Sequence, residues 1–256
     1  MKSVLRAAEL LKLLAREPEA TWRLSDLARE TGLGKTTAHR LLAALVETGL
    51  ARQTPDSRRY QVGPALARLG SRAARVDLAE LARPSLFRIA RETEDTVFLS
   101  AREGPEAVCL DRQVGPFPIR TLTLDIGDRR PLGVGAGSLA LLAFLPEAER
   151  EAAIAASGPA LARYPGFGPE TLRDLVAETR RRGHSFNDGR IVSGMCAIGV
   201  PVRDGKGRVV AAISVAAIRD RMAEARLPSI VALLEAEAAA LSERIRTAAA
   251  PDASPL

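Results

Sequence analysis

Residues 32–50 constrain the fold of this chain more than any other segment. They begin with a tight turn around Gly32 and Gly34, and the turn leads into a helix predicted over residues 35–48. Four apolar side chains at helical spacing give this helix a face to bury: Ala38, Leu41, Leu42 and Leu45. Positive and hydrogen-bonding groups lie at the N-terminal end of its other face: Lys35, Thr36, Thr37, His39 and Arg40. Such groups suit phosphates and base edges in a DNA major groove, although an ordinary helix with a solvated polar face has the same pattern.

The segment before this helix favours the DNA interpretation. Ser25 is a good N-cap residue and precedes apolar residues at Leu27 and Ala28, which predicts a short helix over residues 25–31. Farther upstream, residues 4–15 form a predicted amphipathic helix whose apolar stripe consists of Val4, Ala7, Ala8, Leu11 and Leu14. The order of these helices and the short turn is typical of a helix-turn-helix.

A basic hairpin follows the predicted recognition helix. Residues 50–53 and 58–62 are strand-like, and residues 54–57 between them have turn chemistry. The ordered set of helix, helix-turn-helix and hairpin predicts a winged helix-turn-helix DNA-binding domain over residues 1–63. The side chains expected to face double-stranded DNA are Arg23, Ser25, Lys35, Thr36, Thr37, His39, Arg40, Arg52, Arg58, Arg59 and Tyr60.

The placement of charge agrees with this prediction. The chain has 37 Lys and Arg against 31 Asp and Glu, a net charge of +6. Residues 1–76 hold 14 Lys and Arg against 7 Asp and Glu, so all of the excess positive charge lies in the first third of the chain. A localised basic surface neutralises phosphates and steers association with nucleic acid. A basic surface without a partner is the alternative.

The rest of the chain predicts an α+β domain over residues 77–247. We expect a stiff linker helix over residues 64–76, then a separate helix over residues 78–93 with Pro84 at a kink or at its start. The further elements expected are strands over 96–101, 107–111 and 119–124, helices over 138–145, 146–156 and 169–182, a hairpin of 198–202 and 209–217, and a last helix over 227–247. This order favours an antiparallel sheet covered on one side by helices, with a flexible tail over residues 248–256.

A glycine-rich loop at residues 133–137 opens the helix predicted over residues 138–145. Free N–H groups and the helix dipole make such an N-terminus an anion site, and glycine lets a ligand approach the backbone. The loop lacks the lysine of a P-loop, which argues against a nucleoside triphosphate. Close packing is the other explanation for the small residues.

The motifs together resemble the IclR family of transcriptional regulators. The resemblance rests on residues 32–42, 59–63, 131–143, 183–188, 199–202 and 207–214, which follow the family order over nearly the whole chain. It implies a winged helix joined by a linker helix to a GAF-like α/β effector-binding domain. It also implies a homodimer, or a dimer of dimers, on a palindromic operator, and repression or activation controlled by a small organic acid.

The resemblance also implies an effector pocket. Its expected members are Ile119, Leu122, Arg130, Ala136, Gly137, Ser138, Asn187, Met195, Cys196, Ala197, Ser214 and Ala216. Ala197 and Ala216 replace polar side chains of some relatives, and Cys196 lies one position away from such a site. Arg130 stands where the family usually has an apolar residue, so it either lies on the surface beside Arg129 or faces the ligand.

Other classes of function find less support. Ser100, His184 and Asp188 are available for catalysis, but no Gly-x-Ser-x-Gly motif is present, and Cys109, Cys196 and His184 lack metal-ligand spacing. We therefore expect no enzyme, metal or cofactor, and the charge asymmetry argues against a bare interaction module. Two cysteines, no apolar run of membrane-spanning length and no signal-peptide core indicate a cytoplasmic protein.

Overall fold

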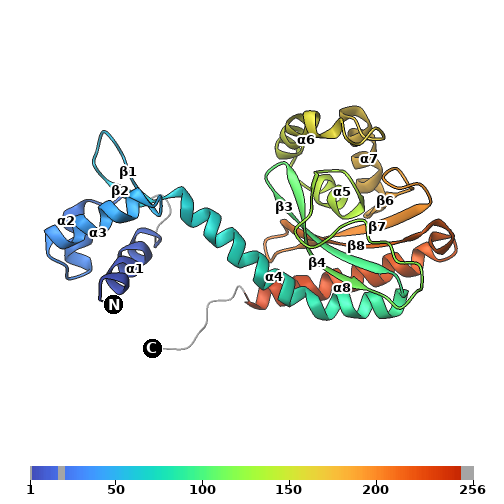
Figure 1. The fold of residues 1–256 in the computed structure, drawn as a ribbon, viewed down its shortest axis with the longest axis horizontal. Helices are drawn as coiled ribbons and strands as arrows, with labels where there is room; N and C mark the ends of the chain where they lie inside the picture. Colours follow the sequence, from blue (N-terminus) through green and yellow to red (C-terminus); the bar gives the residue numbers. More distant parts are fainter. Residues whose placement is uncertain (1, 17–20, 249–256) are drawn as a thin grey trace. The chain divides into compact units, whose positions relative to one another are not determined.

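The computed structural model describes residues 2–16 and 21–248, and the predicted tail beyond Ala248 lies outside them. The chain divides into two compact units, Met1–Ala74 and Arg75–Leu256. Helix α4, Pro64–Thr93, runs from the first unit into the second (Figure 1).

The first unit is a small helical domain with a hairpin. Its elements are α1 (Lys2–Leu14), α2 (Leu24–Glu30), α3 (Lys35–Glu47), β1 (Ala51–Gln53) and β2 (Tyr60–Val62). Its core is formed by Leu10, Leu13, Leu14, Leu27, Leu42, Leu45, Ala51 and Tyr60. The stripe predicted for α1 is confirmed in part: Leu14 is buried and Ala7 and Leu11 pack against the core, whereas Val4 is 74% exposed and Ala8 is exposed. Leu10 and Leu13, which were not predicted, are also buried. The buried side chains lie in the C-terminal half of α1 and pack in one core with residues of α3 and the hairpin.

The start of α2 also differs from the prediction. The helix begins at Leu24, and Arg23 is the extended N-cap residue, with φ −80° and ψ 150° and no side-chain cap. Ser25 therefore lies inside the first turn, exposed to solvent, and caps nothing. Beyond the other end, Gly32 adopts φ +65°, a left-handed conformation that favours glycine and turns the chain toward α3.

The linker helix and the helix predicted after it form one helix. α4 spans 30 residues and contains Pro84, so Pro84 marks no helix start. Pro84 is exposed, whereas Leu86 and Ile89 are buried in a core shared with α8 (Leu227–Ala248) and the sheet. This packing stabilises the helix on both sides of the proline. Helix propensity alone does not predict it, because the packing partners are distant in sequence.

The second unit contains a six-stranded antiparallel sheet, which confirms the α+β class. Its strand order is β5-β4-β3-β8-β7-β6. The strands are β3 (Thr96–Glu103), β4 (Glu106–Val114), β5 (Arg129–Pro131), β6 (Ser185–Asn187), β7 (Met195–Arg203) and β8 (Val209–Ile218). The short edge strands β5 and β6 were not predicted. The strand predicted over residues 119–124 was wrong, because this segment belongs to a loop between β4 and β5.

Helices cover both faces of the sheet, so the prediction of one covered face was wrong. Ile213 and Val215 of β8 pack in the core with α4 and α8, while Ala212 packs in a second core on the other face. That second face is covered by α5 (Ala136–Ala143), α6 (Glu147–Leu161) and α7 (Pro169–Arg182) (Figure 1). Alternate side chains of β8 thus pack into two hydrophobic cores, one on each face of the sheet.

Candidate functional site

The face of α3 predicted to contact DNA is open to solvent. Ala38, Leu42 and Leu45 are buried against the domain core, and Leu41 is half-buried. Five polar side chains on the outer face are exposed: Lys35, Thr36, Thr37, His39 and Arg40. The helix follows Gly34, which is extended and provides no side-chain cap, so the first backbone N–H groups are left for solvent or a ligand.

The hairpin presents some of its predicted contacts and buries one. Arg52 and Arg58 are exposed, whereas Arg59 is half-buried and its Nη1 donates to the Thr21 carbonyl oxygen at 3.0 Å. Tyr60 is only 4% exposed and exchanges two 2.8 Å backbone hydrogen bonds with Trp22. The prediction that Tyr60 faces DNA is therefore corrected, because its ring is part of the hydrophobic core. Arg23 and Ser25 lie exposed at the start of α2.

A pocket opens between α5, the sheet and the loop that joins β4 to β5. Its cavity volume is about 50 Å³, or about 630 Å³ when all the empty space between its walls and the adjoining open solvent is counted. Ten of the twelve residues expected at the effector pocket line it: Arg130, Ala136, Gly137, Ser138, Asn187, Met195, Cys196, Ala197, Ser214 and Ala216. Ile119 and Leu122 are not among the lining residues, and each is 53% exposed, so the structure does not bring them to this pocket.

The N-terminus of α5 forms one wall of the pocket. Gly135 is its N-cap, with φ +96° and no side-chain cap. A Cβ atom on Gly137 would lie 3.1 Å from the Ser214 hydroxyl and 3.2 Å from the Ser100 hydroxyl. The Ser138 hydroxyl already has hydrogen-bond partners within the protein: its Oγ accepts from the Gly133 N–H at 3.0 Å and donates to the Pro131 carbonyl at 3.1 Å. Ser138 thus shapes the loop, while the backbone and Gly137 face the space.

Gly133 supports the packing explanation for part of the loop. Its φ is +96°, and a Cβ atom there would lie 2.4 Å from a Leu172 methyl carbon. The glycine-rich loop therefore serves close packing at its beginning and pocket access at its end.

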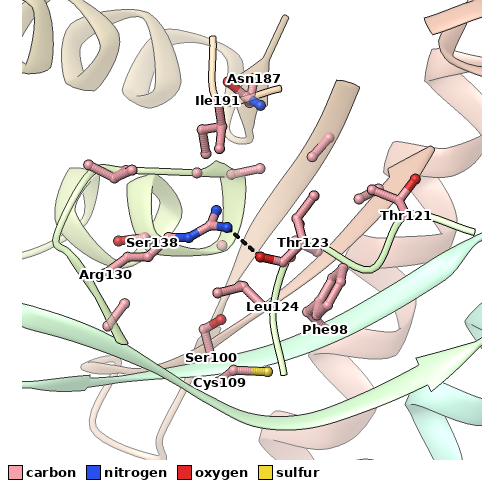
Figure 2. A pocket seen from close by; sticks show the side chains of 18 of the residues that line it. Phe98, Ser100, Cys109, Thr121, Thr123, Leu124, Arg130, Ser138, Asn187 and Ile191 are labelled. Carbon is pink, nitrogen blue, oxygen red and sulfur yellow. Dashed lines mark hydrogen bonds between the residues drawn. The ribbon is translucent and has the colours of Figure 1, made fainter. Parts of the chain in front are cut away.

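Arg130 reaches into the pocket rather than lying on the surface. Its Nη2 donates to the Thr123 carbonyl oxygen at 2.5 Å, a contact drawn in Figure 2. Burial lowers the pKa of the Arg130 guanidinium, although an arginine remains protonated at neutral pH. The pocket therefore contains one fixed positive charge.

Two buried polar atoms that face this region have no partner in the described part of the chain. They are Oδ1 of Asn187 and Oγ1 of Thr121, in residues that are 9% and 2% exposed. Buried polar groups are normally hydrogen-bonded, so both atoms point to an additional bonding group in the pocket, either water or a ligand.

The body of the pocket is apolar. Phe98, Cys109 and Ala216 form a buried cluster, and Leu124 and Ala197 pack against it. Burial raises the pKa of the Cys109 thiol to about 11, and burial also raises the pKa of the Cys196 thiol. Both cysteines are thus neutral, weakly polar walls at neutral pH.

Sequence reasoning missed several lining residues. The missed residues are Phe98, Ser100, Ala107, Cys109, Thr121, Thr123, Leu124, Asp128, Ile191 and Val192. Val134 and Gly135 also line the pocket and belong to the glycine-rich loop predicted as an anion site. Strand pairing could have identified some of these residues. Phe98 of β3, for example, lies opposite Ser214 of β8, which was an expected pocket residue. The loop residues 121–124 carry no such signal, since they have no strand period.

The residues weighed for catalysis do not form one site. Ser100 lines the pocket described above, whereas His184 and Asp188 line a separate surface groove between α7, β6 and α8. Burial lowers the pKa of the His184 imidazole. Within the described ranges, no group of three or more His, Cys, Asp or Glu residues could hold a metal ion. No helix in these ranges is long and apolar enough to cross a membrane.

An exposed recognition helix with a basic hairpin, together with a pocket in a separate α/β unit, defines a DNA-binding regulator. Comparison with known proteins agrees. The model of the IclR helix-turn-helix domain matches residues 3–55, and the model of the bacterial transcriptional regulator IclR C-terminal domain matches residues 71–243. The chain belongs to the IclR family of transcriptional regulators, and the proteins of known role to which it is similar are regulators rather than enzymes.

Individual relatives match over nearly their full length. The transcriptional regulator KipR of Bacillus subtilis is 31% identical over 247 residues, covering 95% of this chain and 97% of the relative. The glycerol operon regulatory protein of Streptomyces coelicolor is also 31% identical over 247 residues, covering 94% and 95%. A crystal structure of an IclR-family regulator from Rhodococcus sp. matches with a TM-score of 0.69 and 28% identity, covering 96% of this chain and 94% of that one.

Proposed function

We propose that this regulator binds a palindromic operator and that a small organic acid in the pocket beside α5 changes its affinity for that operator. The observation that supports the acid is the pocket itself. The N-terminus of α5, one guanidinium and two unpartnered polar atoms face the same largely apolar pocket. A helix N-terminus and a guanidinium both favour a carboxylate.

On the DNA side, we propose that Thr36, Thr37 and Arg40 contact the major groove. Arg58 supports this placement with an exposed positive charge on the hairpin, where it would meet a phosphate. Arg59 is a weaker candidate, because its guanidinium is already bonded to the Thr21 carbonyl. The domain limits that go with this proposal are residues 1–63 for DNA binding, 64–76 for the linker and 77–247 for effector binding.

We also propose that the chain acts as a homodimer, or a dimer of dimers. One short recognition helix reads few base pairs, and a two-fold operator mirrors a two-fold protein. Exposed apolar side chains on the N-terminal unit support such an interface: Val4 is 74%, Leu5 64% and Leu69 57% exposed. A regulator of this kind acts in the cytoplasm, where its operator lies.

The test begins with the operator. A binding site is selected from a random double-stranded DNA library, and its affinity is measured by fluorescence anisotropy with and without pyruvate, benzoate and 4-hydroxybenzoate. The proposal expects the selected site to be palindromic and at least one of these acids to change its affinity by about 5- to 150-fold, the usual range of allosteric coupling. An affinity that none of the acids changes contradicts the effector part of the proposal.

A further inference from the structure

The geometry points to Arg130 as the residue that binds the carboxylate of the ligand. It also restricts the ligand to a molecule with a single carboxylate, a hydroxyl group and an otherwise apolar skeleton. This inference rests on the proposed function of the pocket and adds the chemistry that selects the ligand.

Alternation along β5 separates two neighbouring arginines. Arg129 faces solvent and forms ion pairs with Glu103 and with Glu106, the latter at 3.2 Å. Arg130, the next residue on the strand, faces the pocket. Successive side chains of a strand point to opposite faces, so Arg130 faces the pocket because Arg129 faces solvent.

The charge of Arg130 is only partly offset within the described residues, by the Asp128 carboxylate of the same pocket lining. None of their carboxylates forms an ion pair with it, and its one recorded hydrogen bond goes to the neutral carbonyl of Thr123. A guanidinium has five N–H donors, and most of these remain available. A partly buried charge without an ion-pair partner is unfavourable, and a bound carboxylate supplies both the charge and a two-pronged acceptor.

The helix N-terminus and Arg130 meet at the same place. Nη1 of Arg130 lies 3.4 Å from the position that a Cβ atom would take on Gly135, the N-cap of α5. Figure 2 shows the Arg130 side chain crossing the space beside Ser138 and the first turn of this helix. Because both positive features converge, they favour one carboxylate rather than two at separate ends of the ligand.

The remainder of the lining agrees with a single carboxylate. Arg130 is the one cationic side chain in the pocket lining, and the other charged side chain there is the acidic Asp128. A second carboxylate would meet no cation and one like charge. Oδ1 of Asn187 instead lacks a hydrogen-bond donor, and Oγ1 of Thr121 lacks any partner, so a ligand hydroxyl suits this part of the pocket. The apolar cluster around Phe98 suits the ligand's body.

The test compares three probes of similar shape: 4-hydroxybenzoate, its neutral amide 4-hydroxybenzamide, and the dicarboxylate terephthalate. Binding to the full chain is measured by isothermal titration calorimetry. We expect 4-hydroxybenzoate to bind the wild type at least about tenfold more tightly than either other probe, the value of one charge-assisted hydrogen bond.

Three variants assign the effect to Arg130. Arg130→Gln removes the charge and leaves a neutral amide on a shorter side chain, and it should bind 4-hydroxybenzoate about tenfold more weakly or worse. Arg130→Lys keeps the charge without the planar fork, so its affinity for 4-hydroxybenzoate should lie between those of the wild type and Arg130→Gln. Arg129→Gln is the matched control on the same strand and should bind like the wild type. Circular dichroism melting of each variant establishes that it is folded.

Each contrary result has its own meaning. Equal binding of 4-hydroxybenzoate by the wild type and Arg130→Gln overturns the role of Arg130. Equal binding of terephthalate and 4-hydroxybenzoate overturns the restriction to one carboxylate. Failure of the wild type to bind 4-hydroxybenzoate at millimolar concentration overturns this inference as a whole. The proposed function survives that last result if pyruvate still changes operator affinity, so the two failures are distinguishable.

Discussion

The guanidinium of Arg130 donates a hydrogen bond to the backbone carbonyl of Thr123 at 2.5 Å. This bond ties the edge strand β5 to the loop between β4 and β5. Arg112 makes a similar contact farther along, because its Nη1 donates to the Leu124 carbonyl at 2.7 Å. Two arginines on the sheet thus hold the backbone of a loop that has no strand pairing of its own. A ligand that engages Arg130 acts directly on the support of this loop.

Replacing Arg40 tests the recognition helix. Arg40→Ala should weaken binding to the selected operator by about 1–3 kcal/mol if the guanidinium contacts a base edge. The matched control is Lys12→Ala, an exposed cation on α1 that is not among the proposed DNA contacts. The measurement is fluorescence anisotropy over a range of salt concentrations, and affinity should fall steeply as salt rises. Equal affinities for the wild type and Arg40→Ala would remove α3 from the interface.

Tyr60 tests the correction from a DNA contact to a core residue. Tyr60→Ala should lower the free energy of unfolding of the N-terminal unit by about 3–5 kcal/mol, as for other large aromatic residues in cores. Tyr60→Phe keeps the ring and should leave operator affinity unchanged. The two measurements are chemical denaturation and anisotropy. A folded Tyr60→Phe protein that binds operator much more weakly would restore the hydroxyl as a DNA contact.

Gly137 tests access to the pocket. In Gly137→Val the added side chain meets the hydroxyls of Ser214 and Ser100 at once, which should abolish the effector response while operator binding persists. Gly137→Ala is the milder change, for which those hydroxyls need only turn aside, and it should weaken the response. Gly158→Ala is the control, because a Cβ atom there has no neighbour within 4 Å. A normal response from both Gly137 variants would place the ligand elsewhere.

Asp95 tests an ion-pair cluster that joins the turn between α4 and β3 to the segment between β8 and α8. Its carboxylate is 2% exposed and accepts from Arg221 at 2.7 Å and from Arg226 at 2.8 Å. Asp95→Asn removes the ion-pair partner of Arg226 and leaves Arg221 with the exposed Glu94 alone, so it should lower the free energy of unfolding by about 3–5 kcal/mol. Glu94→Gln is the neighbouring control, since Glu94 is 55% exposed and lies 3.5 Å from Arg221. Equal melting temperatures for the two variants would contradict this prediction.

The thiol of Cys109 provides a test of pH dependence. Burial raises its pKa from 9.0 to about 11, so the thiolate fraction at pH 8 falls about a hundredfold below that of an unperturbed thiol. In a Cys196→Ser background, iodoacetamide should therefore modify the native protein slowly at pH 8 and much faster as pH approaches 11. Denatured protein is the control and should react rapidly at pH 8. Rapid labelling of native protein at pH 8 would show that the thiol is not buried.

Local pattern alone predicted the DNA-binding unit well. The turn at Gly32 and the helix after Gly34 follow from conformational preference and apolar periodicity, and α3 ends within one residue of the prediction. The hairpin pairs as predicted between β1 and β2, although its strands are shorter. These features depend on residues close together in sequence, so the sequence is sufficient to specify them.

The tertiary structure decided what depends on distant partners. Packing in the core of the first unit buried Leu10 and Leu13 of α1 and the ring of Tyr60. Packing against α8 and the sheet keeps α4 helical across Pro84. Pairing with β4 created the edge strand β5 and thereby turned Arg129 outward and Arg130 inward. The sequence by itself determined the periodic helices and turns and, through its motifs, the family. Only the register of strands and the packing of cores decided which side chains meet in the pocket, because those contacts join residues far apart along the chain.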